Sequence, residues 1–289
     1  MPGYGVFLGC LIPFRYPCVE VAIRKVFDAL GADYGFLPDY TCCPEPVFTR
    51  LVDPDFWLTL AARNLALAEE QGFDKLVVPC CGCYESLREA EEALREPEVR
   101  EKVNSALSEI GHEYKGRVEV ESMVETLYRD FLPKLRELAQ RPFRARVAIH
   151  YCCHLFRTRP GEDIWLKHDM TKELLRAAGA EVIHYKLERF CCGFPAFQVD
   201  PEFSLKERLA PKLEAMRAVG ADCVVTFCMA CITQFERGQT MLRRYGYRFN
   251  LPVLHLMEVL ALALGVKPEE LGLEVHRSPV PKLVAMIYR

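Results

Sequence analysis

The chain contains Gly72-Phe-Asp-Lys-Leu-Val-Val-Pro-Cys-Cys-Gly-Cys83 and, 148 residues later, Gly220-Ala-Asp-Cys-Val-Val-Thr-Phe-Cys-Met-Ala-Cys231. In each segment a short apolar run centred on Val-Val leads to a Cys-x-x-Cys pair. Short apolar runs rich in β-branched residues are typical of buried strands. Both segments therefore predict a strand that carries two cysteines at its carboxyl end.

A second pair of segments repeats in the same way. Residues 26–34 lead to Cys42-Cys43, and the similar residues 174–182 lead to a Cys-Cys pair 149 residues after the first. A nearly constant offset with matched apolar patterns indicates an internal repeat. Since strands alternate with helices in each copy, the pattern predicts an α/β fold of two pseudo-symmetric Rossmann-like halves with mainly parallel sheets. The cysteines are expected on loops at strand ends, where open α/β sheets bind ligands.

The repeat also predicts the domain organisation. We expect a first cysteine-rich domain at residues 1–96 and a second at 143–289. Residues 97–142 between them are charged and have a helical pattern, so we expect a helical connector there. Residues 251–265 form an apolar stretch interrupted by His255 and Glu258, which is typical of an ordinary core-facing helix, with a membrane-surface helix as the alternative.

Composition excludes several classes of protein. The 289 residues are 51% hydrophobic and carry a net charge of −3 with both signs interspersed, so a large core is expected and nucleic acid is not an expected partner. No secretory signal and no apolar run of 18 residues are visible. We therefore expect a cytoplasmic protein that reaches a membrane, if at all, peripherally through a complex.

The fourteen cysteines are clustered, which favours metal or redox chemistry over disulfides in a chain without an export signal. The ligand candidates are Cys10, Cys42, Cys43, Cys80 and Cys83 in the first half, and Cys152, Cys153, Cys191, Cys192, Cys228 and Cys231 in the second. Zinc needs only four ligands, and a thioredoxin-like pair would leave most of these thiols without a role. Five or six thiols in each half therefore favour polynuclear iron–sulfur centres.

The spacing of these cysteines resembles the CCG motif of the heterodisulfide reductase B subunit family. In the first half, 31 residues separate Cys10 from Cys42 and 36 separate Cys43 from Cys80. In the second half, the corresponding intervals that precede and follow Cys191-Cys192 are 37 and 35 residues. The resemblance covers nearly the whole chain and includes both copies of the motif.

This resemblance implies two non-cubane [4Fe–4S] clusters that face each other across a substrate site. In the family, a disulfide is split there and each sulfur is captured at one cluster. The five first-half cysteines would hold the cluster nearer the source of electrons, and the six second-half cysteines would hold the distal one. Three thiols fall outside this ligand set: we expect Cys81 to be a bystander between two ligands, and Cys18 and Cys223 to be small buried side chains.

Three further residues are candidates for roles in catalysis. His154 directly follows two expected ligands and could donate a proton to a product thiolate, whereas His150 on the preceding strand is expected to be structural. Arg15 and Arg157 each follow a phenylalanine, five residues beyond the matching positions Cys10 and Cys152. Since guanidinium groups bind carboxylate, sulfonate or phosphate through paired hydrogen bonds, these two could hold the ends of an anionic substrate.

Expected partners follow from what the sequence lacks. It contains no Gly-rich dinucleotide motif and no ferredoxin-type run of cysteines, so no flavin or nicotinamide site is expected in this chain. The resemblance implies a ferredoxin-like C subunit with cubane clusters, and a flavoprotein subunit upstream of it. We therefore expect the catalytic iron–sulfur subunit of a heterodisulfide reductase-like complex. The alternatives are a quinone-interacting subunit of an atypical succinate or fumarate dehydrogenase, a sulfur-oxidation subunit acting on lipoyl- or protein-bound sulfur, and an electron-transfer module without a substrate.

Overall fold

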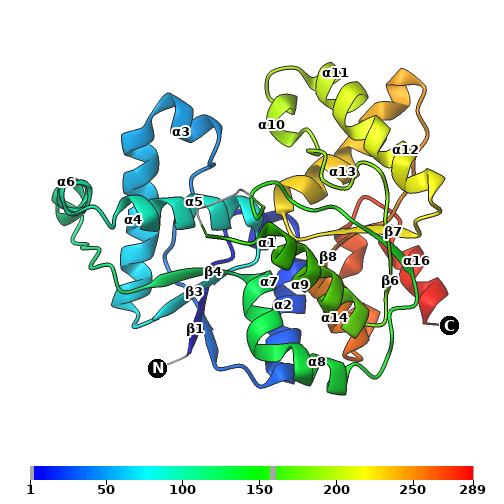
Figure 1. The fold of residues 1–289 in the computed structure, drawn as a ribbon, viewed down its shortest axis with the longest axis horizontal. Helices are drawn as coiled ribbons and strands as arrows, with labels where there is room; N and C mark the ends of the chain where they lie inside the picture. The colour runs from blue at the N-terminus through cyan, green and yellow to red at the C-terminus, as the bar shows by residue number, and fades with distance from the viewer. Residues whose placement is uncertain (1–2, 157–160, 289) are drawn as a thin grey trace.

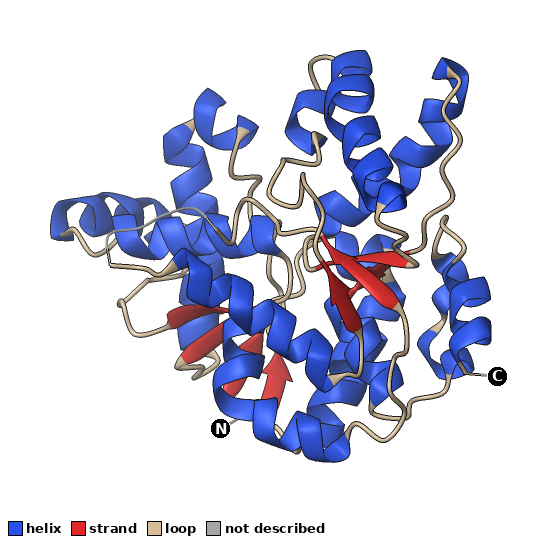
Figure 2. Cartoon of the chain, turned by 45° about the vertical axis from the view of Figure 1, so that its right-hand side comes forward, coloured by secondary structure: helices blue, strands red, loops and turns tan. Residues whose placement is uncertain are grey.

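The computed structural model describes residues 3–156 and 161–288, and two four-stranded parallel sheets form its framework (Figure 1). The first sheet has the order β2-β1-β3-β4 and the second has the matching order β6-β5-β7-β8. The strands are β1 (Tyr4–Val6), β2 (Tyr34–Phe36), β3 (Lys75–Val78), β4 (Glu119–Ser122), β5 (Arg146–Ile149), β6 (Glu181–Ile183), β7 (Cys223–Thr226) and β8 (Val253–His255). Figure 2 shows both groups of strands with helices around them. The predicted α/β fold with two similar halves is confirmed.

Helices connect the strands in both halves. Those that precede the second sheet are α1 (Leu11–Arg15), α2 (Pro17–Leu30), α3 (Phe48–Val52), α4 (Pro54–Glu70), α5 (Cys81–Ala93), α6 (Pro97–Ser108), α7 (Met123–Thr126), the π-helix η1 (Leu127–Phe131) and α8 (Leu132–Leu138). The second half contains α9 (Ile164–Ala177), α10 (Phe194–Phe197), α11 (Pro201–Phe203), the π-helix η2 (Ser204–Leu209), α12 (Ala210–Ala218), α13 (Met229–Leu242), the 3-10 helix η3 (Arg243–Tyr245) and α14 (Leu256–Ala263). The chain then continues through α15 (Pro268–Leu271), the 3-10 helix η4 (Leu273–Val275) and α16 (Val280–Ile287).

The strand order places a ligand-binding position in each sheet. The chain moves from β1 to β2 on one side and then returns to place β3 on the other side of β1. Loops that leave β1 and β3 therefore diverge at the carboxyl ends of these strands and leave a crevice between them. The second sheet repeats this arrangement with β5 between β6 and β7.

One helix from each half packs against a helix of the other half. Helix α14, which follows the last strand of the second sheet, packs on α2 of the first half. Helix α7, which follows the last strand of the first sheet, packs on α9 of the second half. These helices lie together in the lower centre of Figure 1. The buried apolar side chains of both halves form one continuous core, so the two repeats share a single hydrophobic core.

Two segments differ from the sequence-based expectation. The segment 97–142, expected as a helical connector, also supplies β4, because apolar and charged residues alternate from Val118 to Glu121 with the period of a strand. The segment 251–265, expected as one helix, contains β8 followed by α14. His255 ends the strand and caps the helix in a reciprocal arrangement with Glu258. The domain boundaries at 96 and 143 remain predictions.

Among the described residues, no helix is both long enough and apolar enough to cross a membrane.

Candidate iron–sulfur site

The five candidate cysteines of the first half meet at the carboxyl end of its sheet. Cys10 follows β1 and begins α1, Cys42 and Cys43 follow β2, and Cys80 and Cys83 lie at the start of α5 after β3. The thiols lie close enough for neighbours to shift one another's pKa, in a row that runs from Cys10 through Cys42, Cys43 and Cys83 to Cys80. The structure thus brings all five predicted first-half thiols together.

Gly9 makes this close arrangement possible. Its φ angle is +69°, and a Cβ atom at this position would lie 2.7 Å from the sulfur of Cys83. Glycine accepts both the left-handed backbone and the close sulfur, because it has no side chain. The residue therefore allows the end of β1 to touch the thiol that α5 presents.

The second half assembles six thiols in the same way. Cys152 and Cys153 follow β5, Cys191 and Cys192 follow β6, and Cys228 and Cys231 lie at the start of α13 after β7. The thiols of Cys153 and Cys191, and those of Cys191 and Cys192, lie close enough to shift each other's pKa, and Cys192 hydrogen bonds to Cys231. The sulfur of Cys192 lies 3.4 Å from that of Cys231. Cys152 lies behind this row, and its sulfur is within 4.8 Å of both Cys228 and Cys231.

The two sets of cysteines meet at the boundary between the halves. The thiols of Cys80 and Cys228 lie close enough across this boundary to shift each other's pKa. The backbone N–H of Cys81 donates to the carbonyl of Phe227 at 3.2 Å, and the ring of His255 lies 3.1 Å from the carbonyl of Pro79. A single cavity of about 220 Å³ is lined by both sets and includes every predicted ligand except Cys152. The two candidate centres therefore face one shared space.

The donor set fits iron–sulfur clusters. The neighbouring thiol of Cys228 lowers the pKa of Cys80, and that of Cys42 lowers the pKa of Cys43 to about 6. Conversely, neighbouring thiols and burial raise the pKa of Cys83 and of Cys228. Thiolates this close together repel one another, so a site in which all of them are ionised needs cations. Iron ions supply that positive charge, and thiolates are the usual ligands of iron–sulfur clusters.

Two of the cysteines outside the predicted ligand set, Cys81 and Cys223, do not line the cavity. The sulfur of Cys81 donates to the carbonyl of Phe227 at 3.3 Å and lies near the thiol of Cys152. Cys223 is fully buried on β7. Burial raises the pKa of its thiol, and the nearby charge of Asp222 adds to this shift. Both placements agree with bystander roles, which stay predictions.

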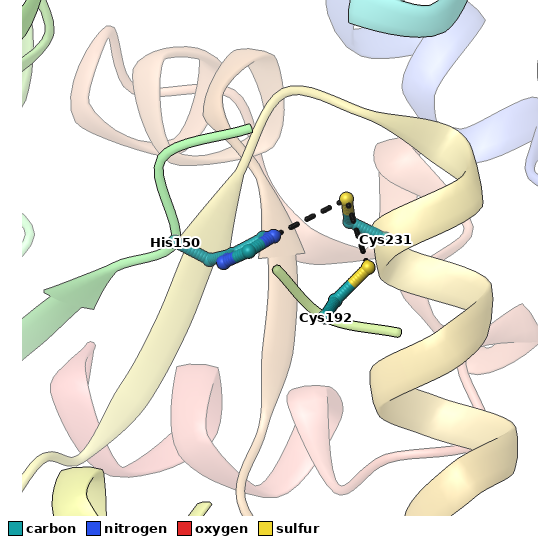
Figure 3. A group of neighbouring side chains, drawn as sticks. All are labelled: His150, Cys192 and Cys231. Carbon is teal, nitrogen blue, oxygen red and sulfur yellow. Dashed lines mark hydrogen bonds between the residues drawn. The ribbon is translucent and has the colours of Figure 1, made fainter. Parts of the chain in front are cut away.

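His150 lies closer to the site than the sequence indicated. Its Nε2 is 3.2 Å from the sulfur of Cys231, and its Nδ1 has no partner in the described structure. Figure 3 shows the ring pointing at Cys231 with Cys192 beyond it. Burial lowers the pKa of His150 to about 3, so the ring is neutral. With its Nε2 protonated, this neutral imidazole would donate to the sulfur of a candidate ligand and so tune a centre held there.

His154 lines the shared cavity, as its neighbourhood to Cys153 suggested. Its Nδ1 pairs with the carboxylate of Glu85, which belongs to α5 of the other half. Glu85 is only 1% exposed, and the sequence analysis did not identify it. The available signal was an acidic residue two positions after Cys83, on the helix that begins between two candidate ligands. A buried carboxylate at such a position needs a partner.

Arg15 does not line the cysteine cavity. It lines a neighbouring cavity of about 160 Å³ together with Arg237, and the two cavities share Leu11 and Phe194. Among the described residues, neither guanidinium has a carboxylate partner; Arg15 lies over the ring of Tyr16. Arg157 is outside the described residues, so its predicted position opposite Arg15 stays a prediction.

A buried lysine holds the loop before the second Cys-Cys pair. Lys212 donates to the carbonyls of Glu188 and Phe190 at 3.0 and 2.8 Å, and also to that of Leu187. Burial lowers its pKa to about 8. This cation fixes the path of the chain into Cys191, and the sequence offered no signal that distinguished it from a surface lysine.

Comparisons with known proteins agree with this geometry. The family described as "CCG: Cysteine-rich domain" matches residues 4–88 and 147–236, which contain the two cysteine sets. The chain is 37% identical to the B subunit of the ferredoxin/F(420)H(2)-dependent CoB-CoM heterodisulfide reductase of Methanosarcina acetivorans, over 100% of this chain and 98% of the relative. It is 28% identical to the "8-methylmenaquinol:fumarate reductase membrane anchor subunit" of Wolinella succinogenes, over 97% of this chain and 98% of the relative.

A solved structure also shares the fold. A hypothetical protein from Helicobacter pylori superposes with a TM-score of 0.75 and 19% identity, over 96% of this chain and 52% of that chain. The two similar halves, the paired cysteine sets and the full-length similarity define the class: the chain belongs to the cysteine-rich CCG family, as a relative of the heterodisulfide reductase B subunits.

Proposed function

We propose that this chain is the catalytic iron–sulfur subunit of a heterodisulfide reductase-like complex. It would carry two non-cubane [4Fe–4S] clusters and reduce, or reversibly form, a disulfide. The observation that carries this proposal is the single cavity lined by both cysteine sets, because a disulfide placed there would have one sulfur near each set. The relative from Methanosarcina acetivorans, named as part of a heterodisulfide reductase, supports the same reaction class.

The reaction needs two electrons and two protons for each disulfide. The clusters would deliver the electrons one at a time, fed by a ferredoxin-like C subunit and an upstream flavoprotein. This chain's residues would position the substrate and supply protons. His154 lines the cavity and pairs with Glu85, so it is placed to donate a proton to a product thiolate. Most other residues that line the cavity are apolar or cysteine, so little water would be held near the substrate sulfurs to compete with His154 as a proton donor.

Anion binding would select the substrate. Arg15 and Arg237 lie in the cavity that adjoins the cysteine cavity, and we assign them the binding of a negatively charged group on the disulfide. Arg157 keeps its proposed role as the second anchor. Replacing Arg15 or Arg237 by Gln should raise KM for an anionic disulfide and leave KM for a neutral disulfide unchanged. If both variants keep the parent's KM for the anionic disulfide as well as for the neutral one, this assignment is contradicted.

The main test is the metal content and its response to substrate. Protein purified without oxygen should contain about eight irons and matching sulfide per chain. Serine at Cys83 or Cys231 should remove or convert a cluster, whereas Cys223→Ala is the matched control with a buried thiol away from the cavity. A disulfide added to the reduced protein should change the cluster spectrum and be consumed. Stoichiometric zinc with little iron would refute the proposal.

A quinone-linked role is the second candidate. The Wolinella succinogenes relative is named as a fumarate reductase subunit, and the shared cavity is lined by apolar residues such as Leu8, Leu11 and Phe194 that could accept a quinone ring. In that case the complex would associate peripherally with a membrane, while a disulfide reductase would remain in the cytoplasm. Oxidation of the reduced protein by a quinone analogue, with no response to disulfides, would select the quinone-linked role.

A further inference from the structure

A second group of metal-type donors lies outside the cysteine cavity. Cys18 of α2, Glu258 of α14 and His276 after η4 place a sulfur, a carboxylate oxygen and a ring nitrogen within 4.8 Å of one another. The side chains of Glu258 and His276 are 0% exposed, and Cys18 is 2% exposed. The group lies where α14 of the second half packs on α2 of the first. Neither of the two cavities described above is lined by these residues.

The spacing of the three donors suits one small metal ion. His276 Nε2 lies 3.7 Å from the sulfur of Cys18 and 2.8 Å from Oε1 of Glu258. With ordinary zinc–ligand bond lengths, two donors on one tetrahedral zinc lie roughly 3.3–3.6 Å apart. The sulfur–nitrogen distance of 3.7 Å lies about 0.1 Å above this range. The oxygen would have to move outward by about 0.5 Å to exchange its hydrogen bond for a metal bond.

The surrounding residues orient these donors. Nδ1 of His276 lies 2.9 Å from Oε1 of Glu236 and would keep its proton beside a metal, because Nε2 is the nitrogen directed at the other two donors. Glu236 is held in turn by Ser278, whose N–H and hydroxyl donate at 3.1 and 2.7 Å. The second oxygen of Glu258 accepts from the backbone N–H of His255 at 2.7 Å. A carboxylate behind the histidine is the usual support of a zinc-bound imidazole.

The charges allow an ion to enter without adding net buried charge. Without a metal, the ring of His276 lies between two carboxylates, with Nδ1 2.9 Å from Glu236 and Nε2 2.8 Å from Glu258, as in a double ion pair. The thiol of Cys18 lies beside this pair, 3.7 Å from Nε2 of His276. A divalent ion would replace one proton on Nε2 and one on the sulfur. Both protons would leave to solvent, bonds to sulfur, nitrogen and oxygen would form, and the net charge of the group would not change.

We propose that Cys18, Glu258 and His276 form a structural site for one divalent metal ion of the zinc type. A mixed set of one thiolate, one imidazole and one carboxylate matches the ligand preference of zinc, and the fourth position would fall to water. The ion would link α14 and the segment after η4 to α2 through its ligand bonds. It would therefore cross-link the two halves at a point outside the cysteine cavity. This site is independent of the proposed function and does not require the clusters.

The test measures zinc and iron in the same anaerobic samples. Wild-type protein, dialysed against a weak chelator, should retain one zinc per chain in addition to its iron. Cys18→Ala should lose the zinc and keep its iron and sulfide. Cys223→Ala, which removes another fully buried thiol, should keep both metals. A wild-type protein with full iron but no zinc, or a Cys18→Ala variant that retains zinc, would overturn the proposal.

Spectroscopy on the wild-type protein covers the case in which Cys18→Ala does not fold. X-ray absorption at the zinc edge should show one sulfur neighbour and the remainder nitrogen or oxygen. Zinc with sulfur neighbours only would place the ion among the clustered cysteines and refute the site. Low iron with one zinc in this mixed environment would refute the proposed function while supporting the zinc site, so the two failures are distinguishable.

Discussion

Replacing Gly9 by alanine should damage the first cysteine set with little effect on the rest of the fold. The φ angle of +69° costs an alanine about 1–2 kcal/mol. The added methyl group would also lie 2.7 Å from the sulfur of Cys83, whereas non-bonded heavy atoms normally approach to about 3.5–4.0 Å. The sulfur must therefore move by roughly 1 Å, which is more than a metal–thiolate bond tolerates, since ligand distances are held within about 0.2 Å.

The matched control is Gly111→Ala. Gly111 has a φ angle of +79°, and a Cβ atom added there would meet nothing within 4 Å, so alanine introduces the backbone strain without the collision. Both variants should lower Tm by a few degrees, at about 2–4 °C per kcal/mol for a chain of this size. Only Gly9→Ala should lose iron, to about half of the parent value if each half holds one cluster. Equal iron in both variants would refute the claim that Gly9 positions Cys83.

Three further predictions concern single side chains. Cys81→Ala should leave iron and sulfide unchanged, and loss of one cluster's spectrum in this variant would make Cys81 a ligand. Glu85→Gln should keep its iron but lower disulfide reduction roughly tenfold or more, because His154 loses its charged partner; an unchanged rate would remove His154 from proton transfer. For Glu121, burial opposes ionisation but hydrogen bonds from Arg129 lower its pKa below 4.5. Glu121→Gln should therefore lower the free energy of unfolding by about 1–3 kcal/mol at pH 7. The difference in unfolding free energy between variant and parent should disappear as the pH falls through the lowered pKa of Glu121. A difference that does not depend on pH would contradict this reasoning.

Local sequence determined most of the elements, though not β4 and β8, and the identity of the clustered thiols. Strands such as β3 and β7 are short, apolar and rich in valine, and glycines such as Gly31 occupy a left-handed position at a helix end, so local propensity and burial act together there. The internal repeat then implied that the two halves share one topology. Because parallel strands present their carboxyl ends at the same edge, the sequence also predicted that the cysteines within each half would meet.

Only the tertiary structure decided how the two halves meet. The contact of Cys80 with Cys228 and the pairing of His154 with Glu85 join residues from different halves, and a repeat pattern contains no information on the interface between its copies. The same reason explains the group of Cys18, Glu258 and His276: these residues are far apart in the sequence and none has a distinctive neighbourhood. They converge because α14 crosses to pack on α2, a consequence of apolar burial between the halves that no local signal could have predicted.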